Sequence, residues 1–392
     1  MDQKEAKRLL RVCIPQITNN DKRKTELLLD ELSKKHKNVK CQSICRLWGG
    51  MGYVYEVSMD SHDDDVDVTT TMIVKRISPL LPQNSDHGDR RKAESYQVEA
   101  NFYQNLAPHL LHSQQPRDFP KITIPHPYHV ERSTAPHDPI TICMSKLHGH
   151  QPYAMDTQET YAVLRWFATF HASTWGPQSS DKAVIDYGLQ PQGTYWYLDT
   201  RLDEHRSMSR KGWQGRLRNA AKAIDTHLKK DTRLHCCVHG DAKDANMLFH
   251  DDDKHTNKNR DKSLHVSMYD FQYCGKGPCT KDLAYFLCVA VQDRNDSLYV
   301  PYYHKELVQR LKSMKKYKNK DEAFTKIDIP SLQDIEESLQ LAYCDWVRFM
   351  CGWGMWGHDM TDEVMAVLDR LDGGRNLGSD GAYDAAVQRE FG

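Results

Sequence analysis

The pattern of apolar and polar positions changes twice along the chain. Residues 1–40 are mostly charged, with leucines at helical spacing over 27–32, which predicts one or two surface helices. From Ser43 to Lys75, β-branched and aromatic residues alternate with polar ones, which predicts a small antiparallel sheet with a polar loop tip. Beyond Gly149 the pattern is mainly helical.

The stretch between the sheet and Gly149 contains further elements. Residues 77–92 carry prolines, a glycine and charges and are typical of a loop. A helix is predicted over 93–106, with Pro108 at its end. Residues 140–147 are typical of a buried strand that leads to Gly149, which we interpret as a hinge between two lobes.

Two helices of the C-terminal half have clear start signals. Asp156 with Glu159, and Ser331 with Asp334, are typical of capping boxes. The second helix carries one apolar stripe: Leu332, Ile335, Leu339, Ala342, Trp346 and Phe349. We therefore predict an α+β chain with a helical leader at 1–40, a small lobe of antiparallel sheet plus helix at 41–147, and a larger, mainly helical lobe at 148–392.

Composition and charge narrow the classes of function. The chain has 392 residues and a net charge of -1, so it lacks the concentrated positive charge of a nucleic-acid or polybasic membrane surface. Its N-terminus has no apolar segment typical of a signal peptide, and the apolar run 283–291 is too short to cross a bilayer. We expect a cytoplasmic protein with small soluble ligands, no nucleic-acid partner and no membrane span.

The strongest chemical signal is a set of polar residues between apolar segments. The sequence LHCCVHGDAKDANMLFH contains Asp241 and, five residues later, Asn246, and the apolar segment VSMYDFQ then delivers Asp270. Mg²⁺ prefers hard oxygen ligands and keeps its other positions for water and phosphate. Asn246 and Asp270 are therefore candidate metal ligands. Asp241 is the candidate base that orients a substrate hydroxyl and accepts its proton during in-line phosphoryl transfer.

These motifs resemble those of a known superfamily. H-G-D-x-x-x-x-N, followed by an apolar residue, any residue and D-F, is similar to the catalytic and metal-binding loops of the aminoglycoside phosphotransferase and choline kinase superfamily. Within it, HGDAKDANMLF, YDFQYCGKGPCTKDLAYFL and FATFHASTW most resemble the ecdysteroid-kinase-like branch. The resemblance implies a two-lobed protein-kinase-like fold, ATP and Mg²⁺ as cofactors and a small-molecule hydroxyl as acceptor.

The resemblance also assigns roles to single residues. It makes Asp241 the catalytic aspartate and, beside the two metal ligands, His239 and Asp282 supports of the catalytic loop. The ring nitrogens of His239 are able to fix a loop, and Asp282 falls in the first turn of a predicted helix, where a carboxylate suits the positive helix end. The alternative for both is local capping. His171 shares a helix face with Trp175, and we expect it to be a satisfied core histidine.

The N-terminal half contains candidates for a phosphate-binding apparatus. In WGGMGY, which precedes a strand, Gly49, Gly50 and Gly52 allow backbone N–H groups to approach nucleotide phosphates. The alternative is an ordinary glycine-rich hairpin turn. Lys75 ends the apolar segment TMIVK, as expected of a lysine that reaches the α- and β-phosphates.

A carboxylate on the following helix is expected to hold Lys75. Glu99 lies beside the apolar stripe of that helix, and Glu94 is the rival candidate. The alternative for lysine and glutamate is that both are solvated surface charges. Met144, on the strand that leads to the hinge, completes the residues that we assign to the nucleotide site.

The acceptor is expected to be a small molecule. Only 11 residues separate Asp270 from Asp282, without an Ala-Pro-Glu triplet, so the long activation segment of protein kinases is missing. Aromatic rings able to stack on a flat hydrophobic acceptor or enclose a quaternary ammonium form two clusters: Tyr195-Trp-Tyr197, and Trp346 with Phe349, Trp353 and Trp356. The alternative is core packing, which we favour for Trp346. Choline or ethanolamine follows from the resemblance alone.

Two other functions fit the same motifs. A pseudokinase would keep the fold as a nucleotide-binding or scaffold protein, although the joint presence of the lysine, its glutamate, the base and both metal ligands disfavours it. The second alternative is an enzyme that transfers a nucleotidyl group from ATP.

A zinc site at His235, Cys236, Cys237 and His239 is disfavoured, because neighbours on a strand point to opposite faces. The hydrophilic insertion 250–262 is expected to be a longer hairpin, and the alternative is that it regulates access to the site.

Overall fold

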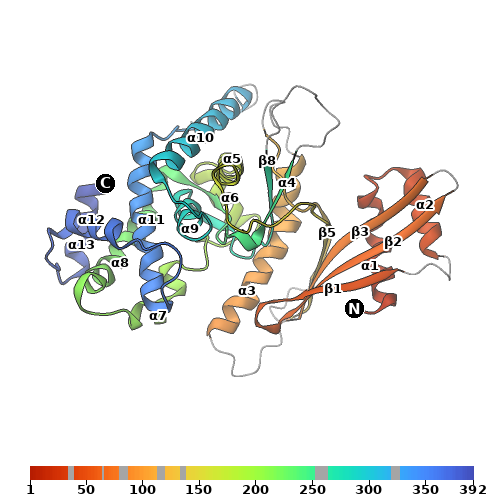
Figure 1. Ribbon diagram of the computed structural model, residues 1–392, viewed down its shortest axis with the longest axis horizontal. Helices are drawn as coiled ribbons and strands as arrows, with labels where there is room; N and C mark the ends of the chain where they lie inside the picture. The colour runs from red at the N-terminus through yellow and green to blue at the C-terminus, as the bar shows by residue number, and fades with distance from the viewer. Residues whose placement is uncertain are drawn as a thin grey trace. The chain divides into compact units, whose positions relative to one another are not determined.

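The computed structural model describes residues 1–33, 39–63, 66–78, 87–112, 120–132, 138–251, 264–318 and 327–392. These residues form two compact units (Figure 1). The first lies within Met1–Ser113 and Ile124–His148, and the second within Gln114–Thr123 and Gly149–Gly392. The insertion predicted at 250–262 lies, apart from its first two residues, outside the described residues.

The first unit is built on an antiparallel sheet whose described strands follow the order β1-β2-β3-β5-β4. The strands are β1 (Lys40–Arg46), β2 (Gly52–Asp63), β3 (Val66–Ile77), β4 (Pro127–Glu131) and β5 (Ile140–Ser145). The sheet predicted from Ser43 to Lys75 and the buried strand after residue 140 are confirmed. β4 goes beyond the prediction. It lies at the edge of the sheet, where Pro127 removes no inner ladder hydrogen bond.

Two N-terminal helices, α1 (Gln3–Ile17) and α2 (Lys22–Ser33), pack on this sheet (Figure 1). The buried positions of α1 recur at helical spacing: Ala6, Leu9, Leu10, Cys13 and Ile14. They share an apolar cluster with Val57 of β2 and with Met72 and Val74 of β3. The predicted N-terminal helices are confirmed, and their apolar faces are part of the core of the first unit.

The helix predicted at 93–106 is longer than expected at both ends. α3 (His87–Asn101) starts inside the stretch predicted as a loop, and it continues through a π-helical segment, η2 (Phe102–Leu106), into α4 (Ala107–His112). Pro108 therefore does not end the helix. A wider π-helical turn precedes it, in which the N–H of Ala107 donates to the carbonyl of Phe102, five residues back.

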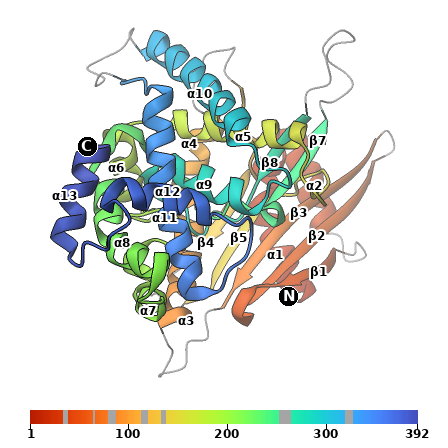
Figure 2. The ribbon, with the colours of Figure 1, turned by 60° about the vertical axis from the view of Figure 1, so that its left-hand side comes forward.

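The second unit is mainly helical, as predicted. Its helices are α5 (Thr157–Ser173), α6 (Pro177–Ile185), α7 (Leu202–Ser207), α8 (Gly212–Lys230), α9 (Thr280–Val289), α10 (Asp296–Lys318), α11 (Leu332–Trp353), α12 (Thr361–Asp372) and α13 (Asp380–Phe391). Figure 2 shows α11 among the other helices of this unit. The capping boxes at Asp156 and Ser331 are both formed, and the apolar stripe of α11 is buried from Ile335 to Phe349. None of the described helices is both long and apolar enough to span a membrane.

Short strands of the second unit pair in two small antiparallel ladders. β6 (His235–Val238) pairs with β9 (Gly275–Pro278), and β7 (Met247–Asp251) pairs with β8 (Leu264–Met268). Short 3-10 turns occur as well: η3 (Leu198–Thr200), η4 (Thr232–Leu234) and η5 (Asp244–Asn246). The loop between β6 and β7, and the residues after β8, carry the predicted base and metal ligands. The predicted α+β class is thus confirmed.

Candidate active site

The loop from β6 to β7 begins with a turn that requires glycine. Gly240 has a φ of +83°, which side-chain-bearing residues rarely adopt. A Cβ at this position would lie 2.2 Å from the carbonyl oxygen of Tyr273. The glycine therefore allows the loop to pass close to the segment after β8 and to present Asp241 next in the chain.

Asp282, in the first turn of α9, holds the backbone of this loop. Its Oδ2 accepts the N–H of His239 at 2.6 Å, and its Oδ1 accepts the N–H of Gly240 at 2.9 Å. Nε2 of His171 lies 3.1 Å from Oδ2, and the other ring nitrogen of His171 lies 2.8 Å from the hydroxyl of Tyr303. His171 is therefore a satisfied core histidine, as expected. Asp282 does more than cap its own helix, because it fixes the turn that precedes Asp241.

His239 joins the loop to the segment after β8. Its Nε2 lies 3.1 Å from the carbonyl oxygen of Tyr269, and its Nδ1 accepts the N–H of Asp241 at 3.3 Å. Burial lowers the pKa of His239, which favours the neutral ring with its hydrogen on Nε2. Both ring nitrogens are thus used to position backbone groups.

The carboxylate of Asp241 is buried among donors from the loop and from α9. Its Oδ2 accepts from Lys243 Nζ at 2.9 Å and from Asn246 Nδ2 at 3.2 Å. Its Oδ1 accepts from the hydroxyl of Tyr285 at 3.0 Å, and Tyr195 donates in turn to Tyr285 at 3.3 Å. Asp241 therefore has a fixed orientation.

Burial and a neighbouring charge shift the pKa of the Asp241 carboxyl in opposite directions. Burial raises the pKa of Asp241, and the Lys243 ammonium counteracts that shift. Burial, together with the negative charge of Asp241, raises the pKa of Tyr285 well above its usual value, so the phenol keeps its proton and donates. A buried carboxylate with raised pKa and defined donors has the properties of a proton acceptor.

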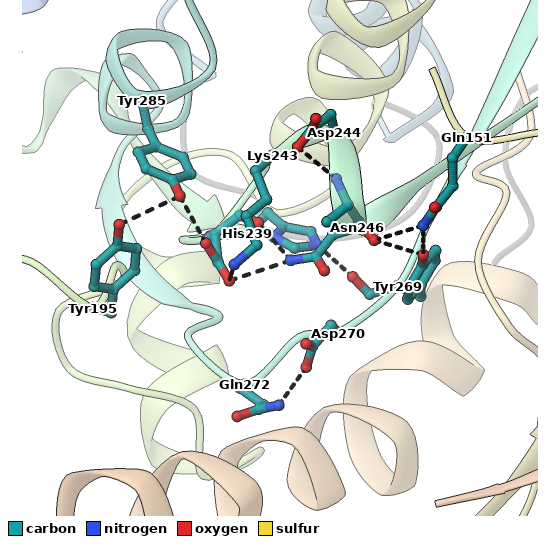
Figure 3. A network of polar contacts seen from close by, with 12 residues as sticks. Gln151, Tyr195, His239, Lys243, Asp244, Asn246, Tyr269, Asp270, Gln272 and Tyr285 are labelled. Carbon is teal, nitrogen blue, oxygen red and sulfur yellow. Dashed lines mark hydrogen bonds and ion pairs between the residues drawn. The ribbon is translucent and has the colours of Figure 1, made fainter. Parts of the chain in front are cut away.

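Asp270 follows β8 in an unusual backbone conformation. Its φ is +66°, in the left-handed region that aspartate tolerates better than most side chains. The N–H of Tyr269 donates to the carbonyl of Asn246 at 3.2 Å, so Asp270 comes directly after the residue paired with Asn246. Its Oδ1 accepts from Gln272 Nε2 at 2.6 Å (Figure 3).

The oxygen atoms near Asp241 that are able to bind a metal suit a hard divalent cation. Asn246 uses its amide nitrogen to bond the backbone and carboxylate of Asp241, which leaves its Oδ1 without a donor among the described residues. This amide oxygen and the Asp270 carboxylate are the kind of ligands that Mg²⁺ takes, together with water and phosphate. The described residues contain no group of three or more His, Cys, Asp or Glu able to hold a metal. Their roles as metal ligands stay predictions.

In the first unit, Lys75 and Glu99 form a buried ion pair. Nζ of Lys75 on β3 lies 2.6 Å from Oε2 of Glu99 on α3, and the two side chains are only 8% and 2% exposed. The ammonium also lies 5.4 Å from the ring centre of Tyr96. The rival residue Glu94 is exposed. The pair itself is thus formed, and its contact with a nucleotide stays a prediction.

The glycine-rich segment forms the tight turn between β1 and β2. The N–H of Leu47 donates to the carbonyl of Gly52 at 2.8 Å, and Gly49 and Gly50 have φ values of +70° and +73°. This is the geometry of a glycine-rich hairpin, and phosphate binding by its amides stays a prediction. Met144 is buried on β5, opposite Ile73 of β3.

The two predicted aromatic clusters form one continuous cluster. Tyr195 lies 5.7 Å from Tyr285, 5.6 Å from Phe349 and 6.5 Å from Trp346, measured between ring centres. Trp346 is buried, as expected. Trp353 and Trp356, past the apolar stripe, are 60% and 42% exposed. Because the hydroxyl of Tyr285 reaches Asp241, this aromatic surface adjoins the candidate base.

Sequence reasoning missed several residues of this site. Lys243 stands only two residues after Asp241, and that closeness was the available signal for an ion pair. Tyr285 and Tyr195 had no comparable signal for their link to Asp241, because one lies 44 residues after the base and the other bonds only the first tyrosine. The contact of His171 with Asp282, 111 residues apart, was equally hidden.

Comparisons with known proteins agree with the class suggested by these motifs. The model of the ecdysteroid kinase-like family matches residues 199–316, which include the candidate base, Asn246, Asp270 and Asp282. The resemblance stated from the motifs is thereby confirmed for this segment. No curated protein matches the sequence.

The chain is also similar to solved structures at low identity. These include an aminoglycoside 2″-phosphotransferase in complex with GDP and kanamycin (12% identity, 88% of this chain and 96% of that one, TM-score 0.44). A spectinomycin phosphotransferase in complex with ADP and spectinomycin aligns at 12% identity over 90% and 94% of the chains, with a TM-score of 0.39. A microcompartment-associated aminopropanol kinase aligns at 13% identity over 86% and 93%, with a TM-score of 0.38.

Proposed function

We propose that this protein is an ATP-dependent phosphotransferase that moves the γ-phosphoryl group to a hydroxyl of a small molecule. The observation that carries the proposal is the buried carboxylate of Asp241, held by Lys243, Asn246 and Tyr285 on a loop that Asp282 fixes from behind. The match of residues 199–316 to the ecdysteroid kinase-like family supports the same reaction class.

Asp241 acts as the base in this proposal. Among the described residues its Oδ1 accepts one hydrogen bond, from Tyr285, and a carboxylate oxygen has room for two. The acceptor hydroxyl donates to the remaining lone pair of Oδ1. As its oxygen forms a bond to the γ-phosphorus, the bond to the β,γ-bridging oxygen breaks, the hydroxyl proton passes to Asp241, and ADP leaves. Tyr285 keeps the carboxylate oriented throughout.

Asn246 and Asp270 would hold Mg²⁺, and Lys75 would bind the nucleotide phosphates. When bound, the cation neutralises charge on the β- and γ-phosphates. Lys75 is suited to the α- and β-phosphates because Glu99 fixes its ammonium at 2.6 Å. The glycine turn and Met144 complete the nucleotide site of the proposal.

The aromatic surface beside Tyr285 favours a neutral acceptor over a quaternary ammonium. The Arg201 guanidinium lies 4.9 Å from the ring centre of Phe349 and 5.3 Å from that of Trp353. These ring faces already receive a cation. Trp356 is 42% exposed, and its ring centre lies 6.3 Å from that of Tyr285, which bonds the base. We infer that the acceptor is a hydrophobic alcohol.

The test is acceptor-dependent ADP release from Mg·ATP. Purified protein is assayed against pooled alcohols, sterols, sugars, amino-alcohols and aminoglycosides, with product analysis to distinguish ADP from pyrophosphate. Asp241→Ala should lower turnover by roughly 10²- to 10⁴-fold with nearly unchanged nucleotide affinity, because it removes the base alone. Asp244→Ala, an exposed carboxylate of the same loop, is the matched control. Full activity of Asp241→Ala would overturn the assignment, and pyrophosphate as product would identify nucleotidyl transfer instead.

A further inference from the structure

A pocket of about 360 Å³ lies in the second unit and shares no residue with the candidate active site. Its wall is formed by the end of α8, by β9, by the first turn of α9 and by the segment around residues 191–199. The volume falls at the lower end of the range of small-molecule sites in proteins. Nothing in the proposed phosphotransfer uses this pocket.

Lysines from three different elements converge on the pocket. Lys229, Lys276 and Lys281 line it, and Asp199 is the one carboxylate among the described lining residues. Lys229 bonds Asp199 at 2.7 Å, and Lys276 bonds Asp181. The carboxylate side chains of those two pairs are 62% and 50% exposed. Exposed ion pairs contribute little to stability, so an anionic ligand is able to replace these carboxylates.

The third lysine is buried. Lys281 is 4% exposed and lies 3.2 Å from Asp345, whose carboxylate also binds Arg348 at 2.9 Å. Lys229 also pairs with the buried carboxylate of Asp225 at 2.5 Å, so Lys229 and Lys281 both have a buried carboxylate partner. The attraction that the pocket exerts on an anion therefore comes from the side where the exposed Asp199 and Asp181 are displaced.

The pocket wall also contains hydrogen-bond acceptors that lack donors among the described residues. His235, 2% exposed, donates from Nε2 to the carbonyl of Leu228 at 3.0 Å, and its Nδ1 has no partner there. Burial lowers the pKa of His235, so the ring is neutral and Nδ1 accepts. Oε1 of Gln192 is a second buried acceptor without a partner. Buried unpaired acceptors are costly, so a ligand with donors gains there.

We propose that this pocket binds a small anion that also carries hydroxyl groups, of the class of polyol phosphates. The anionic group lies among Lys229, Lys276 and Lys281. The hydroxyl groups donate to His235 Nδ1 and Gln192 Oε1. Inorganic phosphate supplies the charge without the polyol, and a neutral polyol supplies the donors without the charge, so each half alone binds more weakly than the whole.

The position of the pocket connects it to the candidate active site. Lys281 precedes Asp282, whose carboxylate holds the backbone of the loop before Asp241. His235 begins β6, which leads into the same loop. An occupant therefore touches both elements that hold the loop, and it is expected to slow hydrogen exchange at the amides of His239 and Gly240.

The experiment is calorimetric titration of the full-length protein with glycerol 3-phosphate, inorganic phosphate and glycerol. Glycerol 3-phosphate should bind at least tenfold more tightly than either half-ligand. Lys276→Met should weaken its binding roughly tenfold or more, and Gln192→Leu roughly threefold or more. Lys222→Met is the matched control, because this exposed lysine of α8 pairs with Asp380 and does not line the pocket.

Several outcomes would overturn the proposal. One is failure of the folded wild-type protein to bind glycerol 3-phosphate. Another is equal binding by Lys276→Met. Loss of binding in Asp241→Ala would place the ligand in the candidate active site instead. Because binding is measured directly, this test is independent of whether the protein transfers phosphate.

Discussion

Each unit buries a charged centre, and the two centres are held in different ways. In the first unit, Lys75 and Glu99 form a close pair between a strand and a helix. In the second, the Asp241 carboxylate receives hydrogen bonds from Lys243, Asn246 and Tyr285. Removal of Lys75 takes a counter-charge from a buried carboxylate, whereas removal of one donor from Asp241 leaves the other two in place. The comparison predicts that single substitutions cost most at the pair.

The largest effect is expected for Lys75→Met. The substitution removes the ammonium that lies 2.6 Å from the Glu99 carboxylate, a side chain only 2% exposed. We expect the free energy of unfolding to fall by about 3–5 kcal/mol. Urea denaturation followed by circular dichroism measures this loss, and a cost below about 1 kcal/mol would contradict the comparison.

The double variant Lys75→Met/Glu99→Leu separates stability from function. Replacing both charges by apolar side chains removes the buried carboxylate together with the ammonium, so most of the lost stability should return. Mg·ATP binding should stay weak, because the ammonium is still missing. If the double variant recovered nucleotide affinity together with stability, the role of the Lys75–Glu99 pair would be purely structural.

The next largest effect is expected for Asp282→Ala. It removes the acceptor of the His239 and Gly240 amides, and buried unpaired N–H groups cost about 1–3 kcal/mol each. A loss of about 3 kcal/mol in the free energy of unfolding is therefore expected. Asp362→Ala is the matched control, because this carboxylate also lies in a first helical turn but is exposed.

The control variant Asp362→Ala distinguishes two explanations for an effect of Asp282: a favourable charge at the helix end, or hydrogen bonds that hold the loop before Asp241. An effect of the helix dipole alone is worth about 0.3–1 kcal/mol, and Asp362→Ala should stay within that range. If both variants lost the same small amount, Asp282 would be an ordinary helix cap and the loop would be held by other contacts.

The sequence predicted the first centre better than the second for a physical reason. On α3, the buried positions Tyr96, Glu99 and Ala100 share one helical face, and Glu94 falls on the exposed side. The place of Glu99 beside the apolar stripe, together with the resemblance of Glu-Ala-Asn-Phe-Tyr103 to the family's helix motif, therefore selected the glutamate that pairs with Lys75. The sheet, the two capping boxes and the order of polar residues around Asp241 follow from local pattern in the same way.

The rest depends on contacts that local pattern does not contain. Tyr285 meets Asp241 only because α9 packs behind the loop, and a tyrosine on a buried helix has no feature that distinguishes it from core. The helix around Pro108 was misjudged because a proline normally ends a helix, whereas here the π-helical turn before it removes the conflict. In both cases the outcome depends on the three-dimensional structure around the residue and not on its neighbours in the sequence.

The smallest effect is expected for Tyr285→Phe. The variant removes one neutral hydrogen bond to Oδ1 of Asp241 and leaves the contacts of Lys243 and Asn246 with Oδ2. A loss of about 1 kcal/mol corresponds to a roughly fivefold lower kcat for the identified acceptor. Tyr195→Phe, one hydrogen bond further from the carboxylate, should lower kcat less. A decrease with Tyr285→Phe as large as that with Asp241→Ala would show that the phenol itself takes part in proton transfer, and that the second centre depends on one donor as strictly as the first depends on its pair.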